Sequence, residues 1–140
     1  MARKFLVISA VLSVVVLGVL AWARFSPEES GPEPGAALVA VSVPEMTGAA
    51  LEGEVLFKTN CAACHGENAA GRNEFGPPLV HKIYEPGHHA DPAFLLAAMR
   101  GVRAHHWPFG DMPPVEGVSE QDVEKIVAYV RTLQRANGIN

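Results

Sequence analysis

Two cysteines and one histidine lie close together in the sequence, in the run CAACH at positions 61–65. Cys61 and Cys64 are the only cysteines of the 140-residue chain, and a disulfide framework normally needs more pairs at wider spacings. On a helical turn, residues at i, i+3 and i+4 project to one face. Cys61, Cys64 and His65 are therefore placed to hold one bound group together.

Three interpretations of this run compete. A zinc site would need two further ligands, and a thiol redox pair would need a βαβ context that the sequence lacks. In a C-x-x-C-H run, the two thiols form thioether bonds to haem vinyl groups while the imidazole reaches the iron. The spacing favours one covalently bound c-type haem, attached at Cys61 and Cys64, with His65 as an iron ligand.

Apolar residues at helical spacing predict helices around this site. The first predicted helix covers residues 48–60 and leads into Cys61. The second begins at Asp91, which we expect to cap it, with Pro92 at the first helical position. Its expected buried face consists of Leu95, Ala98, Met99 and Val102.

The third predicted helix starts with a capping box formed by Ser119 and Asp122 and ends at Asn137. No convincing strand pattern is present, so we expect a small all-α fold. The long connections 66–90 and 103–118 are typical of loops that wrap around something. The apolar stripe of the third helix contains Val123, Ile126, Val127, Val130 and Leu133.

Residues 1–24 form a separate segment. Between Lys4 and Arg24, residues 5–23 are apolar apart from two serines and one glycine. At ~1.5 Å per residue, a helix of this length nearly matches a hydrocarbon core of ~30 Å, and the run exceeds the ~7 to 15 apolar residues of a cleaved signal. We expect a single-pass membrane anchor; the alternative is cleavage after Ala23.

The rest of the chain divides into a linker and a body. Residues 25–47 are rich in Pro, Glu, Ser and Gly, which predicts a flexible linker. The body, residues 48–140, is small enough that a cofactor would help its modest core. The chain has a net charge of −4 and no clustered stripe of Lys and Arg, which excludes nucleic-acid binding as an expected function.

The body resembles class I cytochrome c. In that family, the first and last helices cross beside the haem, with a glycine and two aromatic residues at the crossing. The resemblance assigns these places to Gly53, Phe57 and Tyr129, and it implies a cytochrome c-like fold with one covalent haem c. The matching segments occur in the family's order, at residues 53–57, 61–66, 76–79, 110–114 and 126–130.

The second iron ligand must come from outside the CAACH run. Met112 lies in a loop before Pro113 and Pro114, where the family places its axial methionine. We expect Met99 to pack in the core instead. A histidine, His105 or His106, is the alternative ligand.

Two further residues are expected to contact the haem. The resemblance implies that the carbonyl of Pro77 accepts a hydrogen bond from the second nitrogen of His65, with the adjacent Pro78 as the alternative. Trp107 either donates its N–H to a haem propionate or packs against the haem edge.

The family pattern does not require the remaining histidines. They either cap loops, bind propionates and face solvent, or form a second metal site, for example for copper, or a docking patch that changes charge near pH 6 to 7. The sequence leaves these roles open. They are His81, His88, His89, His105 and His106.

A haem held by both His65 and Met112 has no open coordination position, but it can exchange one electron. We therefore expect a one-electron carrier, not an enzyme, on the periplasmic side of a bacterial inner membrane, or soluble in the periplasm if the anchor is cleaved. Its expected partners are a quinol-oxidising or other donor complex and a terminal oxidase or reductase. The alternatives are a haem enzyme or gas-binding protein with an open distal site, near His105 or His106, and a haem subunit of a larger oxidoreductase complex.

Overall fold

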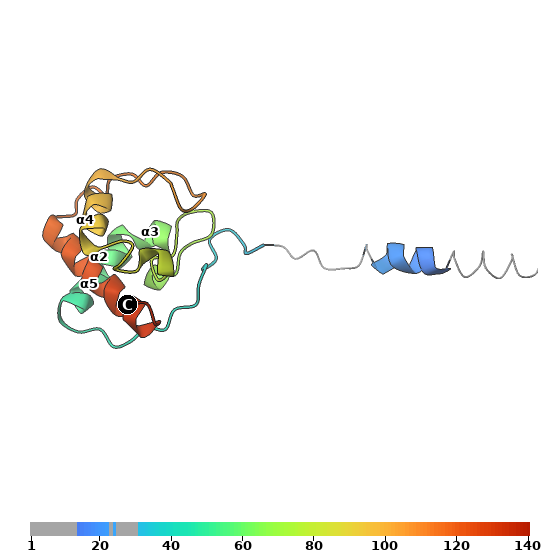
Figure 1. The fold of residues 1–140 in the computed structure, drawn as a ribbon, viewed down its shortest axis with the longest axis horizontal. Helices are drawn as coiled ribbons and strands as arrows, with labels where there is room; N and C mark the ends of the chain where they lie inside the picture. The colour runs from blue at the N-terminus through green and yellow to red at the C-terminus, as the bar shows by residue number, and fades with distance from the viewer. Residues whose placement is uncertain (1–13, 23, 25–30) are drawn as a thin grey trace, which may run out of the picture. The chain divides into compact units, whose positions relative to one another are not determined.

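The computed structural model describes residues 14–22, 24 and 31–140, and it separates the chain into two units, Met1–Gly31 and Pro32–Asn140 (Figure 1). In the first unit, residues 14–22 are helical. The described part of the chain contains no helix with the length and apolar character needed to cross a bilayer. Much of the expected anchor, residues 5–13, lies outside the described residues, so the anchor stays a prediction.

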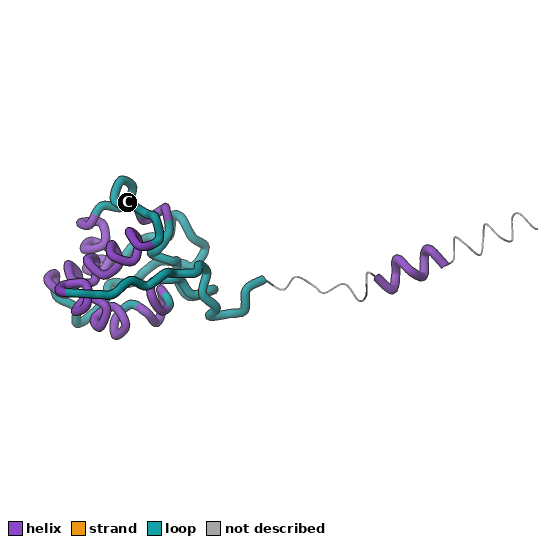
Figure 2. Tube along the Cα trace, turned by 90° about the horizontal axis from the view of Figure 1, so that it is seen from below, coloured by secondary structure: helices purple, strands orange, loops and turns teal. Residues whose placement is uncertain are grey.

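The second unit is mostly helical, as expected. Within residues 31–140, extended pairing is limited to two isolated bridges, Arg72 with Gly76 and Val102 with Met112. Long loops run around the helices (Figure 2). The helices are α2 (Gly48–Asn60), α3 (Ala62–His65), α4 (Asp91–Arg100) and α5 (Glu120–Ala136), with 3-10 turns η1 (Glu67–Ala69) and η2 (Lys82–Tyr84).

Helices α2 and α5 pack against each other at very short range. A side-chain carbon at Gly53 would collide with the backbone carbonyl oxygen of Lys125, so only glycine fits there without movement. Beside this contact, the rings of Phe57 and Tyr129 lie 5.4 Å apart, and both side chains are fully buried. The crossing therefore contains the glycine and the aromatic pair expected from the sequence.

Helix α5 forms where the local sequence predicts it. The Ser119 hydroxyl accepts a hydrogen bond from the Asp122 amide at 3.1 Å, and the Asp122 carboxylate accepts one from the Ser119 amide at 3.0 Å. This reciprocal capping box satisfies two backbone donors at the helix start. The helix ends at Ala136 with Asn137 as its C-cap, and its predicted apolar stripe is buried.

Helix α4 differs from the prediction in its cap and in its buried face. Ala90 is the N-cap and makes no capping bond, whereas Asp91 lies inside the helix and accepts a hydrogen bond from Arg131 at 2.7 Å. None of its residues is fully buried, and Met99 is 40% exposed rather than in the core. Several residues of α4 instead line a cavity, described below, and Met99 is not among them.

Residues 32–47, expected to be linker, lie in the second unit. The amides of Leu38 and Val39 both donate to the Ala70 carbonyl at 3.1 Å. Met46 is only 9% exposed and belongs to the hydrophobic core. The Pro and Glu content of this segment does not reveal these contacts, because the residues that Leu38, Val39 and Met46 contact lie elsewhere in the sequence.

Candidate functional site

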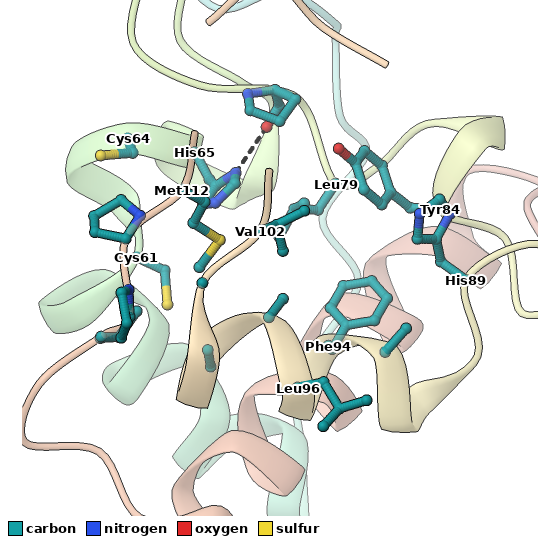
Figure 3. Close-up of a pocket in the computed structure, with 18 of the residues that line it drawn as sticks. Cys61, Cys64, His65, Leu79, Tyr84, His89, Phe94, Leu96, Val102 and Met112 are labelled. Atoms are coloured by element: carbon teal, nitrogen blue, oxygen red, sulfur yellow. Dashed lines mark hydrogen bonds between the residues drawn. The ribbon is translucent and has the colours of Figure 1, made fainter. Parts of the chain in front are cut away.

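The helices of the second unit enclose a cavity of about 640 Å³ (Figure 3). This volume lies within the range of ~300 to 1,000 Å³ that is usual for small-molecule and cofactor sites. Its lining comes from α2, α3, α4 and α5, from the stretch between α3 and α4 and from the loop between α4 and α5, and it is mostly apolar. The apolar walls include Phe57, Leu79, Phe94, Ala97, Val102, Val115, Val123, Ile126 and Val127.

The CAACH run reaches the cavity at the turn between α2 and α3. The Cys61 amide donates to the Phe57 carbonyl at 2.8 Å, and the His65 amide donates to the Cys61 carbonyl at 2.9 Å. This nearly continuous helical turn places Cys61, Cys64 and His65 on the cavity lining (Figure 3). Burial, together with the neighbouring Cys64, raises the pKa of the Cys61 thiol to about 11.

His65 is oriented by a backbone carbonyl. Its ring is 8% exposed, and Nδ1 lies 2.9 Å from the Pro77 carbonyl oxygen. Because a carbonyl only accepts, Nδ1 carries the proton and Nε2 is free to bind a metal. Burial lowers the pKa of His65, partly offset by the bond to Pro77, which favours the neutral imidazole. The structure thus gives the acceptor role to Pro77 and not to Pro78.

Met112 lines the same cavity as His65 (Figure 3). Its backbone is held by the bridge to Val102, with N–H to carbonyl bonds of 2.8 and 2.9 Å. Gly101 packs against this bridge so closely that a side-chain carbon there would lie 2.5 Å from the Met112 carbonyl oxygen. Among the described methionines, Met112 alone lines the cavity.

Trp107 also lines the cavity, and its indole nitrogen Nε1 is the buried side-chain polar atom that lacks a hydrogen-bond partner within the described residues. The ring packs edge-on to His81 at 5.2 Å and stacks on Phe109 at 6.0 Å. A buried donor without a partner costs about 1 to 3 kcal/mol. An acceptor brought by a ligand would remove this cost.

These features fit a haem. The donor groups of the cavity match the attachment and ligation of haem c. They are two thiols on one side of the cavity, a neutral imidazole with a free nitrogen, and a thioether. The unpartnered Trp107 N–H suits a propionate carboxylate. The apolar walls suit the porphyrin faces.

Two further cavity residues are Tyr84, which the sequence did not suggest as a haem contact, and His89, for which propionate binding was one of several alternatives. Tyr84 comes from η2, and His89 comes from the turn that follows. Both lie in the stretch 66–90, which was expected to be one long loop. Burial raises the pKa of Tyr84, and the nearby Trp107 indole partly offsets this, although the two side chains do not reach hydrogen-bonding geometry. No sequence signal marks Tyr84, and His89 was marked only as one of five histidines with several possible roles.

The remaining histidines divide between the cavity and the surface. His105 and His106 line the cavity together with His89, whereas His88 is exposed outside it. His81 accepts a hydrogen bond from the Ile83 amide at 3.2 Å and so caps η2. For His81, the capping role expected as one alternative is therefore observed.

Comparison with known proteins agrees with this geometry. The family model for Cytochrome c matches residues 50–134, more than half of the chain. The cbb3-type cytochrome c oxidase subunit FixP of Bradyrhizobium sp. (strain ORS 278) is 37% identical over 86 residues, which cover 60% of this chain and 27% of the relative. Subunit CcoP of Cereibacter sphaeroides is 34% identical over 84 residues, covering 59% and 27%.

Subunit CcoP of Azospirillum brasilense is 34% identical over 91 residues, covering 61% of this chain and 28% of the relative. The chain thus spans little more than a quarter of the length of these relatives. The matched region contains α3, α4, nearly all of α2 and α5, and every cavity residue discussed above. The chain therefore belongs to the cytochrome c family and carries a covalently bound c-type haem.

Proposed function

We propose that this chain is a one-electron carrier whose haem is attached at Cys61 and Cys64 and ligated by His65 and Met112. The observation that carries the proposal is that His65, with Nε2 free, and Met112 line one cavity. If His65 and Met112 both hold the iron, the bound haem would supply one-electron exchange and would leave no open position for a substrate.

The surrounding residues have positioning roles in this proposal. The Pro77 carbonyl fixes the tautomer and direction of the His65 ring. The bridge to Val102 fixes the loop that carries Met112. Trp107 would donate its N–H to a propionate. The apolar walls exclude water, which disfavours the more highly charged oxidised state and so raises the reduction potential.

We also propose a membrane-anchored location. In this proposal, residues 5–23 form a single-pass helix in a bacterial inner membrane, and the haem domain faces the periplasm. A donor complex that oxidises quinol or another substrate would reduce the haem, and a terminal oxidase or reductase would reoxidise it. The names of the relatives, subunits of cbb3-type cytochrome c oxidases, support the oxidase as acceptor.

The same names favour a second candidate, in which the chain is a haem subunit of a larger oxidoreductase complex. Purification from gently solubilised membranes separates the two candidates. A carrier should be recovered largely as a free protein, whereas a subunit should remain with stoichiometric amounts of the same partner chains.

The carrier proposal is tested by carbon monoxide binding. The reduced wild type should be low-spin and should react slowly near neutral pH, because carbon monoxide must first displace the Met112 sulfur. Met112→Ala should react rapidly, and its oxidised form should lose the weak far-red absorption band of a sulfur–iron bond.

Met99→Ala is the matched control, because Met99 is exposed and does not line the cavity. It should behave as the wild type. Rapid carbon monoxide binding by the wild type, or loss of the far-red band in Met99→Ala alone, would show that Met112 does not hold the iron.

A further inference from the structure

Three histidines gather at the rim of the haem cavity, outside the ligand set assigned above. They are His88, His89 and His106, and one ring nitrogen from each lies within 4.8 Å of the other two. The Nε2 atoms of His88 and His106 are 3.3 Å apart. We call these residues the three-histidine cluster.

The cluster is held in place by bonds to its surroundings. The amides of His88 and His89 both donate to the Glu85 carbonyl, at 3.0 and 2.8 Å. The Arg131 guanidinium, buried on α5, donates to the His89 carbonyl at 2.5 Å. In the side chain of His89, Nδ1 donates to the Ile83 carbonyl at 2.7 Å, which leaves Nε2 free for a cation.

The spacing of the nitrogens suits a tetrahedral metal ion. Two imidazole nitrogens bound to zinc at ~2.0 to 2.1 Å, at a tetrahedral angle, lie roughly 3.4 Å from each other. The 3.3 Å between His88 and His106 already matches this value. The third nitrogen, from His89, lies within 4.8 Å of the other two, and water would supply the fourth ligand.

The chemistry of the cluster selects the class of ion. Imidazole nitrogens suit zinc, copper and nickel, whereas calcium and magnesium require oxygen ligands, and no carboxylate belongs to the cluster. Partial desolvation and the neighbouring imidazoles of His105, His89 and His88 lower the pKa of His106. Neutral imidazole is the form that coordinates a metal.

We propose that His88, His89 and His106 bind one divalent transition-metal cation, Zn²⁺ or Cu²⁺, at the rim of the haem cavity. The order of stability of divalent complexes predicts tighter binding of Cu²⁺ than of Zn²⁺. Two cluster members, His89 and His106, also line the haem cavity, so the cation would lie next to the cofactor. This site is separate from the haem ligands and does not depend on the electron-carrier function.

The test is calorimetric titration of the oxidised, haem-loaded full chain with Zn²⁺, Cu²⁺ and Mg²⁺ in separate experiments. In the loaded protein both cysteines are used by the haem and cannot capture the metal. We expect one Zn²⁺ per chain, tighter binding of Cu²⁺, and no binding of Mg²⁺. His88→Ala, His89→Ala and His106→Ala should each weaken Zn²⁺ binding by about tenfold or more.

His105→Ala is the matched control. His105 is exposed, its Nδ1 donates to the Arg103 carbonyl at 2.8 Å, and it lies outside the cluster although its ring is 4.3 Å from that of His106. The Zn²⁺ dissociation constant of this variant should stay within about threefold of the wild type. An unchanged haem absorption spectrum will show that each variant is folded and loaded.

Two results would overturn the proposal. One is Zn²⁺ binding that is no stronger than Mg²⁺ binding in the wild type. The other is Zn²⁺ binding that survives all three cluster substitutions, or that falls as much in His105→Ala as in them.

Discussion

Tyr129 combines complete burial with an ionisable hydroxyl. Its ring packs against Phe57 in the core, and its hydroxyl donates to the Asn68 side-chain oxygen at 3.3 Å. Burial, with a smaller contribution from Glu54, raises the pKa of Tyr129 to about 12, compared with 10.0 for an ordinary tyrosine. The folded state therefore holds this proton at a pH where the unfolded chain has lost it.

This difference predicts a loss of stability in alkaline solution. Between pH 10 and 12 the unfolded chain binds fewer protons at Tyr129 than the folded chain, so the free energy of unfolding falls as the pH rises. The Tyr129 contribution should be intact at pH 8 and reduced by about 1.4 kcal/mol at pH 11. Denaturant unfolding at both pH values measures the loss. The free energy of unfolding of Tyr129→Phe should fall by correspondingly less between these two pH values. An equal fall in the variant and the wild type would refute the raised pKa of Tyr129.

Two roles are expected for Trp107, donation to a haem propionate and packing against the haem edge, and one substitution separates them. If its buried Nε1 donates to a propionate, Trp107→Phe removes a donor that offsets the propionate charge, and the midpoint potential of the haem should fall. Phe109→Leu, which alters the stacked neighbour but no donor, is the control and should leave the potential nearly unchanged. Equal potentials in Trp107→Phe and the wild type, measured by redox titration, would assign Trp107 to packing alone.

The placement of Cys61, Cys64 and His65 on one cavity could be predicted from the sequence. The three residues share a helical turn, and a short turn is encoded locally. Tyr84 and His89 could not be predicted as cavity residues, because their place depends on bonds from the distant Arg131 to both of their backbone carbonyls.

At the level of the helices, the contact of α2 with α5 determines how the site is closed. The backbone of α2 at Gly53 meets the backbone of α5 at Lys125 without an intervening side chain. This short approach lets Phe57 from α2 and Ile126 from α5 both reach the cavity wall. The geometry of the site thus depends on one position where no side chain is tolerated.

Gly53→Ala should be strongly destabilising, because the added methyl group meets a backbone carbonyl that cannot rotate away. We expect a loss of about 3 kcal/mol in the free energy of unfolding, at the upper end of the usual overpacking cost. Gly87→Ala is the matched control, since nothing lies within 4 Å of a side-chain carbon there. Its stability should change by no more than about 0.5 kcal/mol. A similar loss in both variants, by denaturant unfolding, would show that the crossing is not specifically tight.

The helices also show which sequence signals act only on neighbouring residues. The capping box and apolar stripe of α5 are complete within its own sequence, and the prediction was confirmed. The predicted cap of α4 was wrong because the Asp91 carboxylate is engaged by Arg131, 40 residues further along the chain. Met99 was also expected in the core, but it is 40% exposed and does not line the cavity, and apolar periodicity alone does not reveal this.

For the whole molecule, the proposed anchor predicts where the protein is found in cells. The apolar run 5–23 should keep the protein in the membrane fraction after a high-salt wash, because burial of apolar residues in lipid is insensitive to ionic screening. Mass spectrometry of the purified protein should detect the N-terminal peptide. A soluble periplasmic species that begins at Arg24 would show instead that the segment is cleaved after Ala23.

The contact between Gly53 and Lys125 also limits how early the cavity can form while the chain is being made. The two positions are 72 residues apart, so the entropy of closing this long loop is paid before the contact stabilises the fold. Until α5 has been synthesised, the cavity lacks the wall formed by Val123, Ile126 and Val127, whereas the CAACH run has long since emerged. The two cysteines therefore leave the ribosome before this wall of the cavity exists, and the cavity can close only once α5 has been added.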